Sequence, residues 1–274
     1  MVKRPIPAIL NAMKALLRLV AATLALLFTA PAFAQTRAEW DGVSRIVAIA
    51  DLEGDYDKFA DMLRTANLID ARNNWIGGQT HLVQLGDIPD RGPNTRMIMD
   101  LLIRLEPQAQ RAGGYVHALI GNHEAMNIEG DLRYTDPREF AAFATSRSAR
   151  TRNQYYQQFV RNLRRNPPAA GLPTFDAAYR TQWDQDHPLG WVEHRQAWAP
   201  TGQYGRWIAR HDAVIRINDT LFVHGGLGPN FAAAPRVAMN DDVRLGVRGQ
   251  TSRTYPNIVH DQQGPLWYRG LSQN

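Results

Sequence analysis

The chain has 274 residues, of which 44% are hydrophobic and 21% charged, a composition that is typical of globular proteins and excludes an intrinsically disordered chain. Four of the 31 basic residues and none of the 26 acidic ones lie in residues 1–34. The remaining near-balance of 27 basic and 26 acidic residues excludes a nucleic-acid partner attracted by global charge. The sequence has no cysteine, which excludes disulfides, a cysteine nucleophile and a cysteine-ligated zinc site.

Residues 1–34 have the pattern of an export signal. A basic start leads into the apolar run Leu19–Ala30, and Ala32 and Ala34 are the small residues that signal peptidase requires. The alternative is a membrane anchor, but this run is shorter than the ~20 residues that span a bilayer. We therefore expect a signal peptide at 1–34, cleavage before Gln35 and a single domain at 35–274. The mature protein is expected in the periplasm or secreted, without stable membrane insertion.

Strand and helix patterns alternate in the first part of this domain. Short apolar segments at Ile46–Ala50, Leu82–Leu85 and Tyr115–Ile120 predict three strands. Between them, apolar residues recur at helical spacing in Phe59–Ala66 and Met97–Leu105. This βαβαβ order implies an α/β fold with a parallel sheet, whose strands present functional groups at their carboxyl ends.

The pattern changes from about residue 127 to 210. This stretch holds four of the seven tryptophans and a run of arginines without acidic residues, and we interpret it as a mainly helical insertion that lies over the site. The arginines are interpreted as a solvated helix face, with a substrate-phosphate patch as the alternative. Strand patterns return at Ala213–Ile217 and Leu221–Val223, and Asn218-Asp219 between them predicts a two-residue hairpin turn.

Polar clusters follow four of the predicted strands. They are Asp51–Asp55, Gly86–Gly92, Gly121–Glu124 and His224–Gly226. One such cluster alone is explained by a helix cap or a structural histidine, but four together predict a common site. Carboxylates mixed with an amide and imidazoles suit Mn, Fe or Zn better than Ca, which prefers oxygen ligands only.

The motifs in these clusters resemble those of the calcineurin-like metallophosphoesterases of the phosphoprotein-phosphatase type. The motifs are Gly-Asp-x-x-Asp-Arg-Gly, Gly-Asn-His-Glu and His-Gly-Gly-Leu, and the segments Asn218–Leu227 and Gly264–Gly270 are most similar to the Shewanella-like bacterial branch. The resemblance covers most of residues 45–274. It implies a four-layer α/β/β/α sandwich with two central sheets and two divalent metal ions (Mn, Fe or Zn). It also implies hydrolysis of phosphate monoesters on phosphorylated protein or small phosphoesters, by in-line attack of a metal-bridging hydroxide.

The resemblance assigns the metal ligands by motif. It implies that Asp51 and Glu53 bind the first ion and that Asp87 bridges both ions. Asn122 and His224 are implied as ligands of the second ion. A shared carboxylate suits the bridging position because it offers two oxygens and offsets the repulsion between two cations.

The resemblance also assigns the groups that act on the substrate. His123 is implied as the general acid, with Asp90 orienting its imidazole and raising its pKa. Arg91, Asn122 and Arg269 are implied as binders of the substrate phosphate, since a guanidinium fork matches two phosphate oxygens. The alternatives are a surface ion pair for Arg91 and a structural role for His123.

The sequence departs from the family pattern at two places. Where the family has Asp-x-His-Gly, this chain has Glu53, which either ligates through oxygen or turns away and weakens the first site. In the family, the chain continues beyond the last motif to further strands and a final histidine that binds the second metal. Because this sequence ends at Asn274, we expect an apparently truncated C-terminal sheet and a weak second metal site. His260 is a substitute ligand whose context does not match. Two functional alternatives remain: a nucleotide or dinucleoside-polyphosphate hydrolase, and a degenerate, non-catalytic protein that binds phosphate or a partner.

Overall fold

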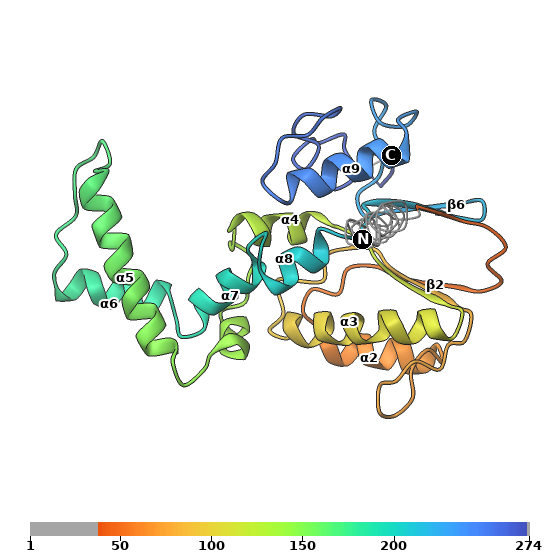
Figure 1. The fold of residues 1–274 in the computed structure, drawn as a ribbon, viewed down its shortest axis with the longest axis horizontal. Coiled ribbons are helices and arrows are strands. Elements are labelled where there is room, and N and C mark those ends of the chain that lie inside the picture. Colours follow the sequence, from red (N-terminus) through yellow and green to blue (C-terminus); the bar gives the residue numbers. More distant parts are fainter. Residues whose placement is uncertain (1–37, 273–274) are drawn as a thin grey trace, which may run out of the picture. The chain divides into compact units, whose positions relative to one another are not determined.

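The computed structural model describes residues 38–272, so the expected export signal lies outside the described residues (Figure 1). One sheet consists of three parallel strands in the order β2-β3-β4, in a register that places Ile46, His81 and Tyr115 side by side. Two helices connect these strands. The elements are β2 (Ile46–Ile49), α2 (Tyr56–Thr65), β3 (His81–Gln84), α3 (Thr95–Arg111) and β4 (Tyr115–Ala118).

The two connecting helices bury their apolar faces on this sheet. Asp55 begins α2, because its side chain accepts a hydrogen bond from the Lys58 N–H at 3.0 Å. One turn further, Phe59 is fully buried, as is Leu102 at the centre of α3. The helix α3 packs against β4 and lies beside α2 (Figure 1). The predicted βαβαβ unit is therefore present, with strand ends that differ from the prediction by one or two residues.

The second sheet has the order β1-β5-β6 and contains the predicted hairpin. Its strands are β1 (Glu39–Trp40), β5 (Val214–Ile217) and β6 (Thr220–Val223). The strands β5 and β6 are antiparallel, and Asn218 in the turn between them has φ 53°. The sequence pattern did not predict β1, because two residues are too few to show a period.

The two sheets pack face to face. One buried cluster fills the space between them and consists of Trp40, Val83, Leu119, Ile215 and Ile217. Ile215 and Ile217 are two positions apart in β5, so their side chains point to the same face of the strand. On the opposite face, Val214 packs with Met239 and Val243 of α9 (Arg236–Gly246). The order of layers is thus helices, sheet, sheet and helix, which confirms the predicted α/β/β/α sandwich.

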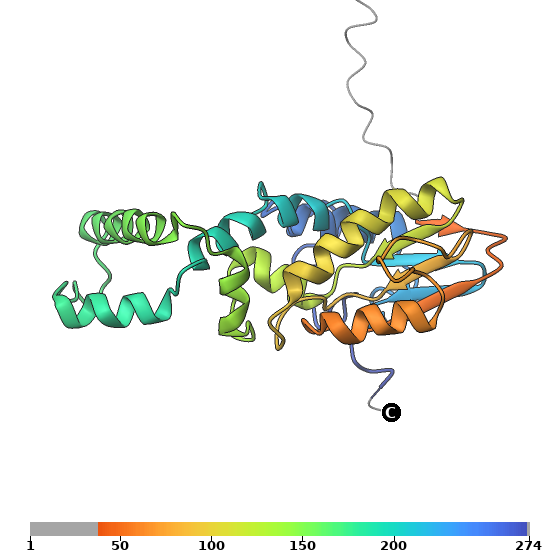
Figure 2. The same ribbon diagram turned by 90° about the horizontal axis from the view of Figure 1, so that it is seen from below.

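Residues 131–210 contain helices and, in the described chain, no strand. Figure 2 shows α5 and α6 side by side and away from the sheets. Arg147, Arg150 and Arg161 are exposed, which favours the solvated interpretation of the arginine run. Within residues 38–272, no helix combines the length and hydropathy that a membrane span requires. The elements of this stretch and the helix before it are α4 (Asn122–Glu129), the 3-10 helix η1 (Pro137–Phe143), α5 (Ser148–Arg165), α6 (Ala177–Asp186), α7 (Trp191–Trp198) and α8 (Gln203–Ile208).

Candidate metal centre and catalytic site

The loops after β2, β3, β4 and β6 bring four of the predicted metal ligands together. His224 Nε2 lies 2.9 Å from Asn122 Oδ1 and 3.3 Å from Asp87 Oδ2. His224 Nδ1 lies 3.8 Å from Asp51 Oδ1. Asp87, Asn122 and the side chain of His224 are buried, whereas Asp51 is exposed. Residues from both sheets therefore meet at one site that is open on the Asp51 side.

A backbone hydrogen bond fixes the orientation of the His224 ring. Nδ1 lies 3.0 Å from the Leu85 carbonyl oxygen, which can only accept, so Nδ1 donates and Nε2 faces the site. As a metal ligand His224 would be neutral and would offer the lone pair of Nε2. The neighbouring Gly86 has φ 95°, and a Cβ there would lie 2.6 Å from the Gly121 nitrogen and 3.1 Å from His224 Nδ1. A glycine is needed at position 86 to let these two loops approach so closely.

The donor set fits a divalent transition metal. One ligand atom each from Asp51, Asp87 and His224 can lie within 4.8 Å of one another, and the Asn122 amide oxygen adds a fourth donor on the His224 side. Carboxylate, amide and imidazole donors suit Mn, Fe or Zn. Burial raises the pKa of the Asp87 carboxyl, but the hydrogen bond and charge of His224 in its protonated form, with the charge of His123, outweigh burial and leave this pKa below its ordinary value. Asp87 is therefore ionised and able to ligate.

Glu124, for which the sequence indicated no role, ties two of these loops together. Its carboxylate accepts hydrogen bonds from the N–H groups of Asp87 at 3.0 Å, Ile88 at 2.8 Å and Gly121 at 2.8 Å. Burial and the charge of Asp87 raise the pKa of Glu124 to about 7. A sequence signal for this role was present. Glu124 is the third residue of a helix that begins after Gly121, and a glutamate at this position forms a capping box with the residue before the helix.

His123 and Asp90 form the predicted pair. His123 Nδ1 lies 2.6 Å from Asp90 Oδ2, and the other oxygen of Asp90 accepts hydrogen bonds from Asn127 Nδ2 at 3.0 Å and Thr135 Oγ1 at 2.8 Å. Burial lowers the pKa of His123, but the hydrogen bond to Asp90 and the nearby carboxylates outweigh it, so this pKa is raised. His123 Nε2 lies 3.8 Å from Asp87 Oδ2, next to the ligand group. The pair thus places the Nε2 atom of an imidazole with a raised pKa next to the metal ligands.

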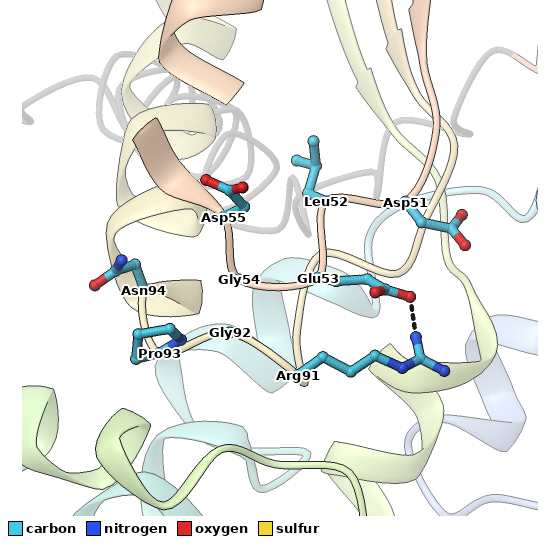
Figure 3. A pocket seen from close by; sticks show the side chains of 9 residues that line it. All are labelled: Asp51, Leu52, Glu53, Gly54, Asp55, Arg91, Gly92, Pro93 and Asn94. Atoms are coloured by element: carbon cyan, nitrogen blue, oxygen red, sulfur yellow. Dashed lines mark hydrogen bonds and ion pairs between the residues drawn. The ribbon is translucent and has the colours of Figure 1, made fainter. Parts of the chain in front are cut away.

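Arg91 contacts Glu53 at the mouth of the site. The two side chains form an ion pair (Figure 3), and both line a cavity of about 400 Å³. The Arg91 guanidinium also lies 5.5 Å from the centre of the Tyr134 ring, whose own centre is 5.2 Å from that of His123. Tyr134 was not among the predicted site residues, because a lone aromatic residue in a loop carries no pattern. The structure places Glu53 against Arg91 and outside the group formed by Asp51, Asp87 and His224.

Arg269 reaches the site from the last described turn. Its Nη2 lies 3.3 Å from His224 Nε2 and 3.4 Å from Asn122 Oδ1. Its Nη1 would lie 2.6 Å from a Cβ at Gly225, so the glycine makes room for the guanidinium. His260, the candidate substitute ligand, instead pairs with Glu129 at 3.0 Å. Arg269 therefore contacts the two atoms that the family pattern assigns to the second ion.

Comparisons with known proteins agree with this geometry. Residues 44–270 match the family model described as calcineurin-like phosphoesterase. The chain is 31% identical to Shewanella-like protein phosphatase 2 of Arabidopsis thaliana over 242 residues, which cover 87% of this chain and 60% of that protein. It is 27% identical to Shewanella-like protein phosphatase 1 of Plasmodium berghei over 243 residues, which cover 86% of this chain and 54% of that protein.

A solved structure has a similar fold. It is the crystal structure of the cold-active protein-tyrosine phosphatase of a psychrophilic Shewanella species, with a TM-score of 0.63 and 26% identity over 87% of this chain and 60% of the other. The chain thus spans 54% to 60% of the length of these relatives. Because the family model matches most of the chain and the polar clusters meet in one site, this protein belongs to the calcineurin-like phosphoesterase family.

Proposed function

We propose that the protein is a metal-dependent phosphomonoesterase that acts on phosphoproteins. The observation that carries this proposal is the position of His123, whose Nε2 lies 3.8 Å from a metal-ligand carboxylate while Asp90 holds its other nitrogen at 2.6 Å. A proton donor held beside a group of metal ligands is what cleavage of a phosphate ester requires. The Shewanella-like relatives support a phosphoprotein substrate, and the likeness to a Shewanella protein-tyrosine phosphatase makes phosphotyrosine the first substrate to test.

The chain's own residues supply binding, orientation and proton transfer. Asp51, Asp87, Asn122 and His224 would hold two divalent ions, Mn, Fe or Zn, which would polarise the phosphoryl group and supply the nucleophile when bound. The guanidinium of Arg91 binds two phosphate oxygens and thereby orients the ester.

Proton transfer is the role of the buried pair. His123 Nε2 donates its proton to the leaving oxygen of the ester. Asp90 stabilises the imidazolium before the transfer, because its carboxylate accepts the hydrogen bond from Nδ1. Arg269, beside Asn122 and His224, offers a second guanidinium to the phosphate.

Hydrolysis by the purified full chain tests this function. We expect a phosphotyrosine peptide and p-nitrophenyl phosphate to be hydrolysed with Mn present and not after chelation. Asp87→Asn should lose bound metal and activity together, because it removes charge from the central ligand. His123→Asn should keep its metal and lose turnover by about 10²–10⁴-fold on the peptide, with a smaller loss on the aryl ester, whose leaving group needs less protonation.

Three results would contradict the proposal. Hydrolysis that persists after chelation excludes metal dependence. Activity confined to nucleotides or dinucleoside polyphosphates identifies the alternative hydrolase. Metal binding without turnover of any of these esters identifies the non-catalytic alternative.

We also propose that the protein acts in the periplasm or after secretion. The basic and apolar pattern of residues 1–34, with Ala32 and Ala34 before Gln35, supports this location. Intact-mass measurement of the protein from its native host is the test, and a mature mass that begins at Gln35 is expected. Soluble protein in the cytoplasm that retains residues 1–34 would contradict it.

A further inference from the structure

The ion pair between Glu53 and Arg91 gives Glu53 a role that the family motif does not assign. We propose that Glu53 is the resting counter-ion of Arg91, which incoming substrate phosphate must displace, and that it is not a metal ligand. This inference rests on the proposed function, because it takes Arg91 as the group that binds phosphate. It concerns the position at which this chain departs from the Asp-x-His-Gly pattern of its family.

The local backbone directs Glu53 toward Arg91. Glu53 has φ 47°, and its N–H donates to the Asp87 carbonyl oxygen at 3.1 Å, so the loop is fixed to the segment that leads to Arg91. Figure 3 shows the Glu53 carboxylate facing the guanidinium. Asp51 is the residue of this loop that joins the ligand group with Asp87 and His224.

Arg91 is held in place by contacts other than Glu53. Its N–H donates to the Tyr134 carbonyl oxygen at 2.9 Å, and its guanidinium lies 5.5 Å from the centre of the Tyr134 ring. The Arg91 guanidinium therefore stays in position when the anion that it binds is exchanged. What changes on exchange is the anion that the guanidinium binds.

Solvent exposure makes this exchange possible. The side chain of Arg91 is 47% exposed and that of Glu53 is 35% exposed, so water can solvate both groups when the pair opens. Exposed ion pairs of this kind change a binding constant by about two- to fivefold. The pair is thus weak enough to open and strong enough to compete with a weakly bound anion.

Phosphate is the anion that can replace this carboxylate. A phosphate dianion offers three oxygens and more charge to the same guanidinium fork, whereas another carboxylate offers only what Glu53 already supplies. Glu53 therefore opposes phosphate in two ways, as a competitor for Arg91 and as a like charge beside the incoming dianion. Removing its charge should strengthen phosphate binding by about three- to tenfold.

Asp55 provides the matched control. It lines the same cavity and carries the same charge, but it caps α2 through the Lys58 N–H at 3.0 Å. Asparagine is as good a helix cap as aspartate, so Asp55→Asn removes the charge and keeps the helix start. The comparison separates the specific pair from a general loss of negative charge at the cavity.

Calorimetric titration of the full chain with inorganic phosphate after chelation, and with Mn in phosphate-free buffer, is the experiment. We expect Glu53→Gln to bind phosphate about three- to tenfold more tightly than the parent and to keep the Mn affinity of the parent within about twofold. Asp55→Asn should change phosphate affinity by less than about twofold. Melting temperatures of the parent and both variants verify that all three are folded.

Three results would overturn the inference. They are an equal gain in Asp55→Asn and Glu53→Gln, a large loss of Mn affinity in Glu53→Gln, and phosphate binding that Glu53→Gln leaves unchanged. Failure of the proposed function is a separate outcome. A chain that hydrolyses no ester but gains phosphate affinity in Glu53→Gln keeps the counter-ion role and loses the enzymatic one.

Discussion

Replacing Asp90 with asparagine should change the pH range in which the protein turns over its substrate. Burial by itself lowers the pKa of His123, and the Asp90 hydrogen bond at 2.6 Å is the largest contribution that raises it. A hydrogen bond to a charged partner contributes about 1.5–3 kcal/mol, which corresponds to about one to two pKa units. Asp90→Asn should therefore lower the pKa of His123 by about this amount.

The sign follows from the role of the protonated ring. The general acid is present below its pKa and is lost as the pH rises through it, so the alkaline limb of the kcat profile should move to lower pH in Asp90→Asn. The profile is measured with a phosphotyrosine peptide at saturating Mn.

Thr135→Val is the control, because it removes a donor to Asp90 at 2.8 Å and leaves the bond to His123 in place. This control should keep the alkaline limb or shift it slightly upward. An alkaline limb that does not move in Asp90→Asn would refute the assignment of His123 as the acid whose pKa Asp90 controls.

Two further predictions concern stability and the second ion. His194 is buried, and burial lowers its pKa from 6.5 to about 3. Between these two pH values the unfolded chain binds a proton at this residue and the folded chain does not. Stability should therefore fall by about 2 kcal/mol between pH 7 and pH 5 from this group alone, and urea unfolding of His194→Leu should show a correspondingly weaker pH dependence. Arg269→Gln should raise the affinity for a second Mn ion by about tenfold, because it removes the positive guanidinium that contacts Asn122 Oδ1 and His224 Nε2. Calorimetric titration with Mn measures this affinity, and an unchanged second-site affinity would contradict the prediction.

The sequence was sufficient to predict the site where side-chain chemistry and strand position coincide. Asp51, Asp87 and His123 each follow a short apolar strand, and a parallel sheet brings such positions to one edge. The strand patterns at Ala213–Ile217 and Leu221–Val223, with Asn218-Asp219 between them, predicted the hairpin of β5 and β6. These predictions depend on local patterns, which the sequence shows directly.

The remaining features depend on contacts between distant segments. No pattern around Glu53 indicates that its carboxylate meets Arg91, which lies 38 residues further along the chain. Tyr134 and Thr135 reach Arg91 and Asp90 from a loop after α4, whose path is fixed by packing and not by a period. The motif placed Asn122 among the candidate ligands, but its contact with Arg269 joins it to a residue 147 positions further along the chain.

The backbone at the site is itself unusual in a way that bears on function. In residues 38–272, eight residues other than glycine have positive φ, and the four outside the site are all asparagine, which tolerates this region through its short polar side chain. The four at the site are Glu53, Asp87, Asp90 and Arg91. Glutamate and arginine gain no local compensation there, so their conformations cost free energy that the surrounding structure must offset.

Glu124 supplies part of that offset. Its carboxylate accepts three backbone hydrogen bonds from the two loops that carry Asp87 and Asn122. A hydrogen bond contributes about 0.5–1.5 kcal/mol even where the acceptor is neutral, and a strained backbone conformation costs about 1–3 kcal/mol. One buried carboxylate can therefore hold the Asp87 loop in a conformation that the loop would not adopt alone. At positions with positive φ the backbone favours glycine or asparagine, but the site has carboxylates and an arginine there. The proposed chemistry needs these charged side chains, so the site keeps them at a cost in backbone strain.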